Sequence, residues 1–175
     1  MSVARPRAGD ALRRALLRSR LRAARSEAHV AGLFPAVGRV LAVSRVYVFQ
    51  NFSDPVSGEL CVRLRYEWTD GSVESLIDVP LFDHIAYREA GLEQLVEPLS
   101  ENRPVELHRA DAGAAGELFD QQEIRSMLNL PIVCRGRWWG LVGADECRRE
   151  RQWQPAERGL LQSVAAAYGR RARPD

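Results

Sequence analysis

The stretch that decides the fold is residues 130–144, which read LPIVCRGRWWGLVGA. Two apolar runs flank Arg135-Gly136, and a short glycine-containing pair between apolar runs is typical of the tight turn in a β-hairpin. Gly140 and Gly143 lie inside the second run and lack the spacing of a phosphate-binding loop. We therefore expect these two glycines to allow the close approach of a neighbouring strand or helix.

Regular patterns extend outward from this hairpin in both directions. After it, Pro155 suits the first position of a helix whose apolar stripe ends near residue 168. Before it, residues 46–49 (VYVF) predict a buried strand, and residues 60–68 alternate between apolar and polar side chains as a half-buried strand does. At the N-terminal end, Asp10 is a candidate cap for a helix over residues 11–31, and a short second helix is expected near residues 37–41.

The middle of the chain is less regular. Residues 75–87 have no firm period, residues 91–99 and 117–127 favour helices, and Pro104 places residues 103–107 in an edge strand. The resulting order is helix, two strands, mixed middle, helix, hairpin, helix. This order predicts an α+β fold, a central antiparallel sheet of five to six strands with helices on its faces. It argues against a doubly wound nucleotide-binding fold.

Charge is distributed in blocks along the 175 residues. All 25 basic residues are arginine, and the formal net charge is +2. Eight arginines fall in residues 1–25, whereas residues 67–123 hold fourteen acidic residues and three arginines. No apolar run has the ~20 residues of a membrane span, and no signal peptide is evident, so we expect a cytoplasmic protein without membrane contact. The acidic middle argues against a nucleic-acid partner.

The sequence contains no motif that commits it to catalysis. His29, His84 and His108 lie on separate predicted elements, so we expect no metal site. The three cysteines, Cys61, Cys134 and Cys147, are too far apart in sequence for a CxxC motif. Cys147 is the best candidate for a redox-sensitive thiol, because neighbouring arginines lower the pKa of a thiol. The carboxylates at residues 145, 146 and 150 are interpreted as a solvated loop of ion pairs. We expect no enzymatic activity and no cofactor.

Two blocks of the sequence resemble GAF domains of bacterial sensory proteins. The first is VSRVYVFQN at residues 43–51 with RYEW at residues 65–68, and the second runs from Leu130 to Gly169. The resemblance covers about residues 20–170. It implies terminal helices on one face of the sheet and, on the other, a ligand pocket built from short helices and loops over residues 70–125. It divides the chain into a disordered N-terminus (1–9), a signalling and dimerisation helix (10–31), the GAF domain (32–172) and a short tail (173–175).

The resemblance implies a homodimeric regulatory module that binds a small molecule and signals through its terminal helices to a partner such as a kinase. The charge of residues 67–123 indicates that the ligand is not strongly anionic. The candidate pocket residues are Phe49, Trp68, Ile77, Ile85, Tyr87 and Trp139. The candidate dimer residues are Leu17, Leu21, Leu161, Val164 and Tyr168.

Departures from the family patterns argue against two known classes of ligand. Asp145-Glu146 and Trp153 stand where the cyclic-nucleotide-binding members carry an Asn-Lys pair and a phenylalanine, and no cysteine is followed by the histidine common in bilin-binding members. Two alternatives remain open. One is a thiol sensor or an enzyme similar to methionine sulfoxide reductase that uses Cys147, and the other is a protein-interaction module without a ligand.

Overall fold

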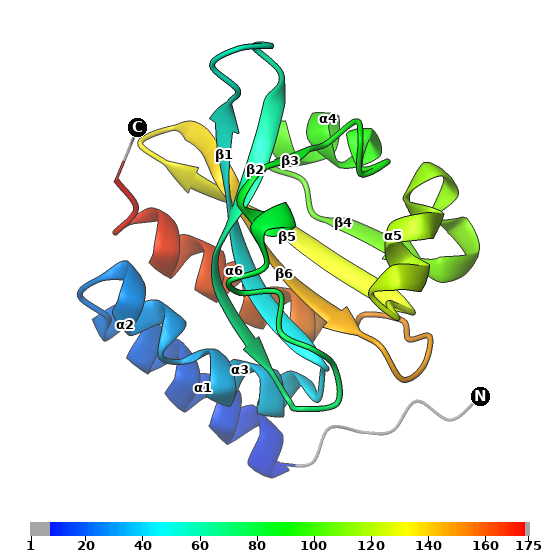
Figure 1. The fold of residues 1–175 in the computed structure, drawn as a ribbon. Coiled ribbons are helices and arrows are strands. Elements are labelled where there is room, and N and C mark those ends of the chain that lie inside the picture. Colours follow the sequence, from blue (N-terminus) through cyan, green and yellow to red (C-terminus); the bar gives the residue numbers. More distant parts are fainter. Residues whose placement is uncertain (1–7, 174–175) are drawn as a thin grey trace.

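A six-stranded antiparallel sheet forms the centre of the protein, as a computed structural model that describes residues 8–173 shows (Figure 1). The strands lie in the order β3-β2-β1-β6-β5-β4. Their bounds are β1 Arg45–Ser53, β2 Leu60–Thr69, β3 Ile85–Ala86, β4 Val105–His108, β5 Ser126–Cys134 and β6 Arg137–Glu146. The α+β fold class, the β5–β6 hairpin and the edge position of β4 are therefore confirmed.

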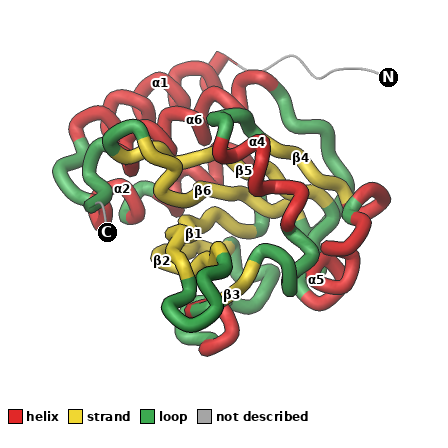
Figure 2. Tube along the Cα trace, turned by 90° about the horizontal axis from the view of Figure 1, so that it is seen from above, coloured by secondary structure: helices red, strands yellow, loops and turns green. Residues whose placement is uncertain are grey.

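One face of the sheet is covered by the helices from the two ends of the chain (Figure 2). These are α1 Ala8–Ala23, α2 Glu27–Ala31, α3 Phe34–Leu41 and α6 Pro155–Gly169. The expected single helix over residues 11–31 is split, because the Ser26 side chain accepts a hydrogen bond from the backbone N–H of His29 and begins α2 as a new helix. Asp10 lies inside the first turn of α1 rather than before it.

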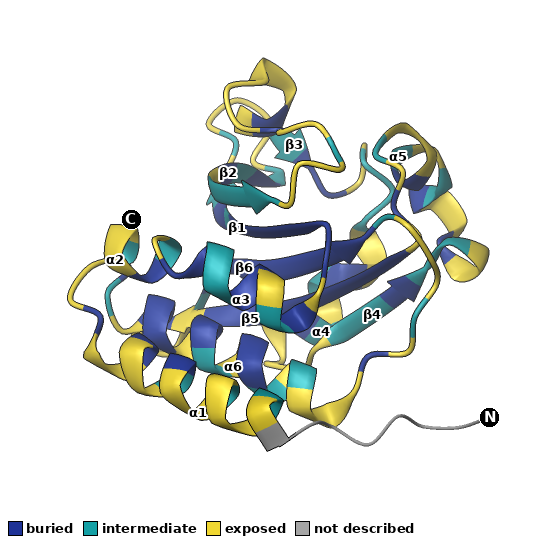
Figure 3. Ribbon diagram, turned by 90° about the horizontal axis from the view of Figure 1, so that it is seen from below, coloured by how far each residue is buried: buried dark blue, intermediate teal, exposed yellow. Residues whose placement is uncertain are grey.

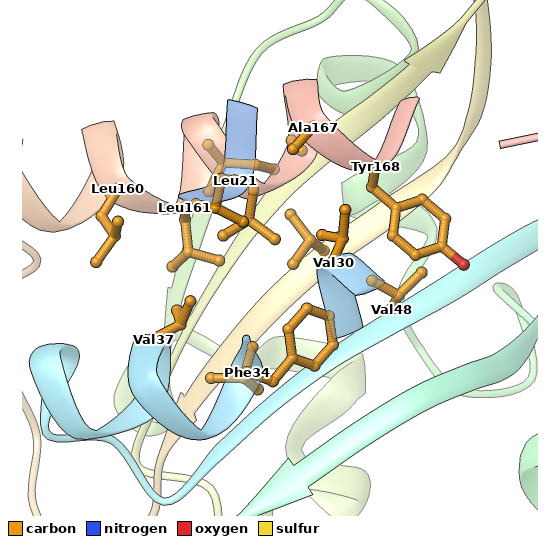
Figure 4. Packing of buried hydrophobic residues seen from close by; sticks show 14 of the residues in the cluster. Leu21, Val30, Phe34, Val37, Val48, Leu160, Leu161, Ala167 and Tyr168 are labelled. Atoms are coloured by element: carbon orange, nitrogen blue, oxygen red, sulfur yellow. The ribbon is translucent and has the colours of Figure 1, made fainter. Parts of the chain in front are cut away.

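The larger apolar core lies between this helical layer and the sheet. Figure 4 shows Leu21 of α1, Leu161 and Tyr168 of α6 and Phe34 of α3 packed over Val48 of β1. All five side chains are at most 1% exposed. This core fixes the terminal helices to the sheet of the same chain.

Residues 70–125 cover the opposite face of the sheet and form a second apolar core. They contain α4 Val96–Ser100, α5 Gly116–Gln121 and the short 3-10 turns η1 Pro80–Asp83, η2 Glu93–Leu95, η3 Arg109–Asp111 and η4 Gly113–Ala115. The helix expected over residues 117–127 ends early, because Glu123 adopts a left-handed φ of 55° and the chain enters β5 at Ser126. Few regular elements and many turns form this side.

Two β-bulges change which face of the sheet a side chain occupies. In β2, Val48 of β1 pairs with Tyr66 and Phe49 pairs with Leu64, so Arg65 is an extra residue. In β6, Val133 pairs with Trp138 and Ile132 pairs with Gly140, so Trp139 is an extra residue. An extra residue reverses the alternation of the side chains beyond it, because side chains alternate with a period of two.

The prediction of a disordered segment over residues 1–9 falls mostly outside the described residues. Only Ala8 and Gly9 are described, and both belong to α1. Of the expected tail, only Arg173 is described. Between residues 8 and 173, no helix is both long and apolar enough to cross a membrane.

Candidate ligand pocket

A small cavity lies between the sheet and the segment that covers its second face. Its volume is about 60 Å³. The apolar wall comes from both layers and consists of Phe49, Val62, Leu76, Phe82, Ile85, Tyr87, Ala90, Leu92, Leu95, Leu118, Ile124, Met127 and Leu141. Arg45, Tyr47, Asn129, Asp145 and Gln122 contribute to the remaining wall. The cavity therefore combines an apolar interior with a cluster of buried polar side chains.

Three of the six side chains expected in the pocket line this cavity, namely Phe49, Ile85 and Tyr87. Ile77 lies outside it and is 41% exposed. Trp68 and Trp139 pack on the helical side of the sheet instead. The expected pocket role of these three residues is wrong for this cavity, and the two bulges account for the tryptophans.

The bulge at Arg65 has a second effect, because it turns Glu67 toward the pocket face. There Glu67 Oε1 lies 3.0 Å from Arg45 Nε, and Arg45 Nη1 donates a hydrogen bond of 3.1 Å to Asp145 Oδ2. The side chains of all three residues are 2% exposed. One guanidinium is thus shared by two carboxylates inside the protein, on three adjacent strands.

The polar cluster continues through the phenol of Tyr47. Its oxygen lies 2.9 Å from Asp145 Oδ1 and 3.1 Å from Asn129 Oδ1. Burial raises the pKa of Tyr47, with the Asp145 carboxylate adding to the effect, so the phenol keeps its proton. Burial also raises the pKa of Asp145, although Arg45 and Tyr47 act in the opposite direction. The single cation has to serve Glu67 as well, which is consistent with the raised value.

The same cluster holds down the cover loop, which we define as residues 70–84 between β2 and β3. Glu67 Oε2 accepts hydrogen bonds from the backbone N–H of Leu76 at 2.8 Å and of Ile77 at 3.3 Å, and from the Ser75 hydroxyl at 2.5 Å. Arg45 Nη2 donates to the Glu74 carbonyl at 3.1 Å. Leu76, which these bonds position, is one of the side chains that close the cavity.

Two grooves on the surface adjoin the buried cavity. One, of about 260 Å³, runs between the cover loop and α5, and the other, of about 640 Å³, runs along residues 71–79 and 120–123. Phe82 and Gln122 line the cavity and both grooves. Phe82 is 5% exposed, so this residue lies in the interior where the cavity and the two grooves meet.

Sequence reasoning missed Arg45, Glu67 and Asp145 as site residues. Asp145 and Glu146 were interpreted as part of a solvated loop, but β6 continues to Glu146 and both are at most 2% exposed. A usable signal was present in residues 43–48 (VSRVYV), because a charged side chain within a run of strand-forming apolar residues requires a buried partner.

The three cysteines differ in exposure, and Cys147 is the one that is only partly buried. Cys61 and Cys134 are buried, and all three are free. The pKa of Cys147 is raised to about 12, chiefly by burial and then by Asp145, and these effects outweigh the lowering by Arg45. Arg45 does lower the pKa of this thiol, but the net shift is upward, so the expectation of a lowered thiol pKa is wrong. Among residues 8–173, no group of three His, Cys, Asp or Glu side chains is suited to hold a metal ion.

The side chains expected to contact a second subunit lie inside one chain. Leu17, Leu21, Leu161, Val164 and Tyr168 are between 0% and 4% exposed and belong to the core beneath the helical layer. Their apolar spacing reflects packing on the sheet and on α3, so a second copy of the chain cannot reach them. Leu12 and Leu16 of α1 are instead 62% and 58% exposed. Much of α1 is coloured as exposed in Figure 3.

The fold and the pocket together define a sensory domain of known type. The family model for the GAF domain matches residues 36–171. The chain belongs to the GAF domain family.

Relatives of this chain include histidine kinases. It is 34% identical over 134 residues to the methanogenesis regulatory histidine kinase FilI of Methanothrix harundinacea. The matched region is 76% of this chain and 15% of the kinase. It is 40% identical over 47 residues to the circadian input-output histidine kinase CikA of Synechococcus elongatus, which covers 27% of this chain and 6% of that kinase. The chain thus spans only a small part of these relatives.

Solved structures share the fold at low sequence identity. The phycocyanobilin-bound GAF domain of a cyanobacterial phytochrome superposes with a TM-score of 0.70 at 15% identity, covering 97% of this chain and 93% of that domain. The chromophore-binding domain of a bacteriophytochrome from R. palustris superposes with a TM-score of 0.72 at 15% identity. The superposition covers 95% of this chain and 61% of that domain. Because the sequence identity is 15% in both cases, these superpositions show a shared fold.

Proposed function

We propose that this chain is a non-catalytic sensory module of the cytoplasm that binds a small molecule beneath the cover loop and passes the occupancy of that site to a signalling partner. The observation that carries the proposal is the cavity itself. It is mainly apolar, and one side of it is covered by a loop whose position depends on a few polar contacts with Arg45 and Glu67. A ligand that displaces Phe82 would join the cavity to a surface groove.

A chain of contacts leads from the polar cluster to the helical layer. Glu146, which follows Asp145 on β6, lies 3.5 Å from Arg151 through its Oε2. Arg151 also pairs with Glu157, and Glu157 Oε2 accepts a hydrogen bond from the backbone N–H of Gln154 in the capping box of α6. A shift at the end of β6 would therefore reach the first turn of α6. The signal would act by changing the relative populations of two positions of that helix.

The kinase names of the relatives support a histidine kinase as the partner or output. A homodimer would suit such an output. We place its contact on the outward face of α1, around Leu12 and Leu16, rather than on the buried seam. The acidic character of residues 67–123 supports a ligand that is not strongly anionic.

A second candidate function is a protein-interaction module that needs no ligand. It is favoured by the small volume of the cavity, because ligand sites usually span about 300–1,000 Å³. In this case Phe82 and Tyr87 would be permanent core residues, and the cover loop would not open.

Native mass spectrometry of the freshly purified protein, together with a variant that fills the cavity, separates the two functions. Ala90 lines both the cavity and the groove of about 260 Å³, so Ala90→Leu is expected to occupy the space that a ligand needs. A bound mass that is present in the wild type and lost in Ala90→Leu supports the sensory module. Equal thermal stability of both proteins, with no bound mass in either, supports the module without a ligand.

A further inference from the structure

We infer that the ligand of this pocket is an organic cation, with an apolar body in the cavity and a positively charged group in the groove between the cover loop and α5. This inference rests on the proposed function and names the chemical class of its ligand. It follows from the charges that surround the cavity, from the route by which the cavity is reached, and from the combined volume of cavity and groove.

The first observation concerns the buried charge behind the cavity wall. Arg45 is the one cation of the cluster, and it faces two carboxylates, Glu67 and Asp145. The contact with Glu67 is an ion pair without an aligned hydrogen bond, because neither Arg45 Nε nor Glu67 Oε1 has a hydrogen-bond partner. Electrostatic effects are strong where water is excluded. Arg45 is thus already engaged by two carboxylates, and the cluster disfavours a negative charge on a molecule that enters the neighbouring cavity.

The second observation concerns the entrance. The groove of about 260 Å³ shares five residues with the cavity wall, and they are Phe82, Ile85, Ala90, Leu118 and Gln122. Its remaining lining includes the exposed carboxylates Glu89 and Glu117, while no arginine belongs to it. The arginine nearest in sequence, Arg88, is paired with Glu59, and His84 of the lining pairs with Asp54. A cation that enters here meets negative charge at the mouth, and apolar side chains beyond it.

The third observation is the size of the combined space. The cavity alone, at about 60 Å³, is too small for a typical ligand, but with the groove it reaches the lower end of the usual range of about 300–1,000 Å³. Phe82 is one of the five residues that line both spaces. An elongated molecule with one charged end fits this shape, because its apolar end can replace the Phe82 ring while its head stays in water beside Glu89 and Glu117.

A matched set of three probes tests the inference by isothermal titration calorimetry on the wild-type chain. The probes are 3-phenylpropylamine, 3-phenylpropanol and 3-phenylpropanoate, which share one body and differ in the charge of the head. The amine is expected to bind at least about tenfold more tightly than the alcohol, a ratio that corresponds to one well-placed charge interaction. The carboxylate is expected not to bind.

Two double variants locate the head group. Glu89→Gln with Glu117→Gln removes the carboxylates of the groove, whereas Glu93→Gln with Glu97→Gln removes two exposed carboxylates of the same acidic segment outside both hollows. The first pair of substitutions is expected to lower the affinity for the amine several-fold and to leave the affinity for the alcohol unchanged. The second pair is expected to leave both unchanged. All four positions are exposed, so folding is expected to be preserved.

The outcomes separate this inference from the function on which it rests. Equal affinity for the amine and the alcohol would contradict the inference that the ligand is a cation. The proposal of a ligand pocket would remain. An equal loss of amine affinity in both double variants would overturn the assignment of the head group to Glu89 and Glu117. The absence of binding by all three probes would overturn both the inference and the pocket.

Discussion

Arg45 and Asp145 are joined across two neighbouring strands, β1 and β6, by a hydrogen bond of 3.1 Å between Nη1 and Oδ2, and both side chains are 2% exposed. They are also paired in the register of the sheet. The pair closes one end of the pocket, and Glu67 and the Glu74 carbonyl share the same guanidinium. The guanidinium is therefore a structural centre for the sheet and the cover loop together.

Replacing Arg45 should be costly. Arg45→Met leaves Asp145 and Glu67 buried without a cation, and removal of one partner from a buried pair costs about 3–5 kcal/mol. Urea unfolding followed by circular dichroism measures the free energy of unfolding. The matched control is Arg103→Met, whose pair with Glu101 is more than half exposed on both sides, and it is expected to cost at most about 1 kcal/mol. A loss at Arg45 no larger than at Arg103 would contradict the structural role.

Asp145 should give the stability a defined dependence on pH. Burial raises the pKa of Asp145 in the folded state above its ordinary value, so the folded protein holds this proton more tightly than the unfolded chain does. The resulting stabilisation is complete below the ordinary pKa of about 4 and is lost as the pH rises through the raised value.

The variant Asp145→Asn keeps a neutral group at this position at every pH. The free energy of unfolding of the wild type, minus that of Asp145→Asn, is therefore expected to fall as the pH rises above about 4. Urea titrations at several pH values measure the difference, and the exposed Asp111→Asn serves as the control. A difference that rises with pH would reverse the sign of the pKa shift.

Gly143 should tolerate no side chain, because the Tyr47 ring lies against β6 at this point. A Cβ atom there would stand 2.2 Å from the ring and 2.4 Å from Asn129 Oδ1. Gly143→Ala is expected to lower the free energy of unfolding by about 1–3 kcal/mol, the usual cost of overpacking.

Gly116→Ala is the matched control for that change. Gly116 has helical dihedral angles of −56° and −39°, and an added Cβ would make only ordinary contact at 3.4 Å with Arg109. Because alanine favours a helix over glycine, this variant is expected to be neutral or stabilising by up to about 1 kcal/mol. Similar losses in both variants would show that the Tyr47 contact does not limit Gly143.

Cys147 should react slowly with an electrophile in the folded protein. Its pKa of about 12 leaves little thiolate at neutral pH, and the thiolate is the reactive form. Alkylation by iodoacetamide at pH 7.5, followed by mass spectrometry, is expected to be at least about a hundredfold slower than for an unperturbed cysteine. The same protein in urea provides the control, since all three cysteines should then react. Rapid modification of Cys147 in the folded state would revive the thiol-sensor alternative.

The outward face of α1 should decide the oligomeric state. The wild type is expected to be a dimer in light scattering, on the proposed function. Leu12→Glu with Leu16→Glu places charge on the exposed stripe and is expected to give a monomer. A matched control is Val56→Glu, which adds charge at a side chain that is 95% exposed in the β1–β2 turn. A monomeric wild type at micromolar concentration would contradict the dimer itself.

Local patterns in the sequence were sufficient for the class of fold. The hairpin at residues 130–144, the strand at 46–49 and the helix after Pro155 are each encoded by adjacent residues. The expected reason for the glycines in β6 is confirmed as well, because a Cβ at Gly140 would meet the Phe49 carbonyl at 2.1 Å. Such contacts follow from residue size and strand pairing.

The site was harder to predict, because it depends on which face each side chain occupies. A strict alternation places Trp68 in the pocket and Glu67 in solvent, and the extra residue at Arg65 exchanges the two. Trp139 moves for the same reason. Nothing local marks a bulge in either strand, since its position is set by how the partner strand pairs across the sheet.

The apolar pattern of the terminal helices also did not show which surface buries them. The apolar stripe of α1 is equally compatible with a second subunit and with the chain's own sheet. Only the tertiary packing of Leu21 against α6 and of Phe34 over Val48 distinguishes them. A stripe of small and apolar residues indicates that one face of a helix is buried. It does not indicate which element packs against that face.

The bulge at Arg65 has one more consequence. Glu67 and Trp68 are adjacent and lie on opposite faces of β2, and the bulge turns Glu67 toward the cover loop and Trp68 toward the helices. The first holds the cover loop through Leu76, and the second lies against α3, where Gly38 leaves no spare room beside the indole ring. Adjacent residues of one strand thus contact the cover loop on one face of the sheet and α3 on the other, which would couple a displacement of the loop to the helical layer.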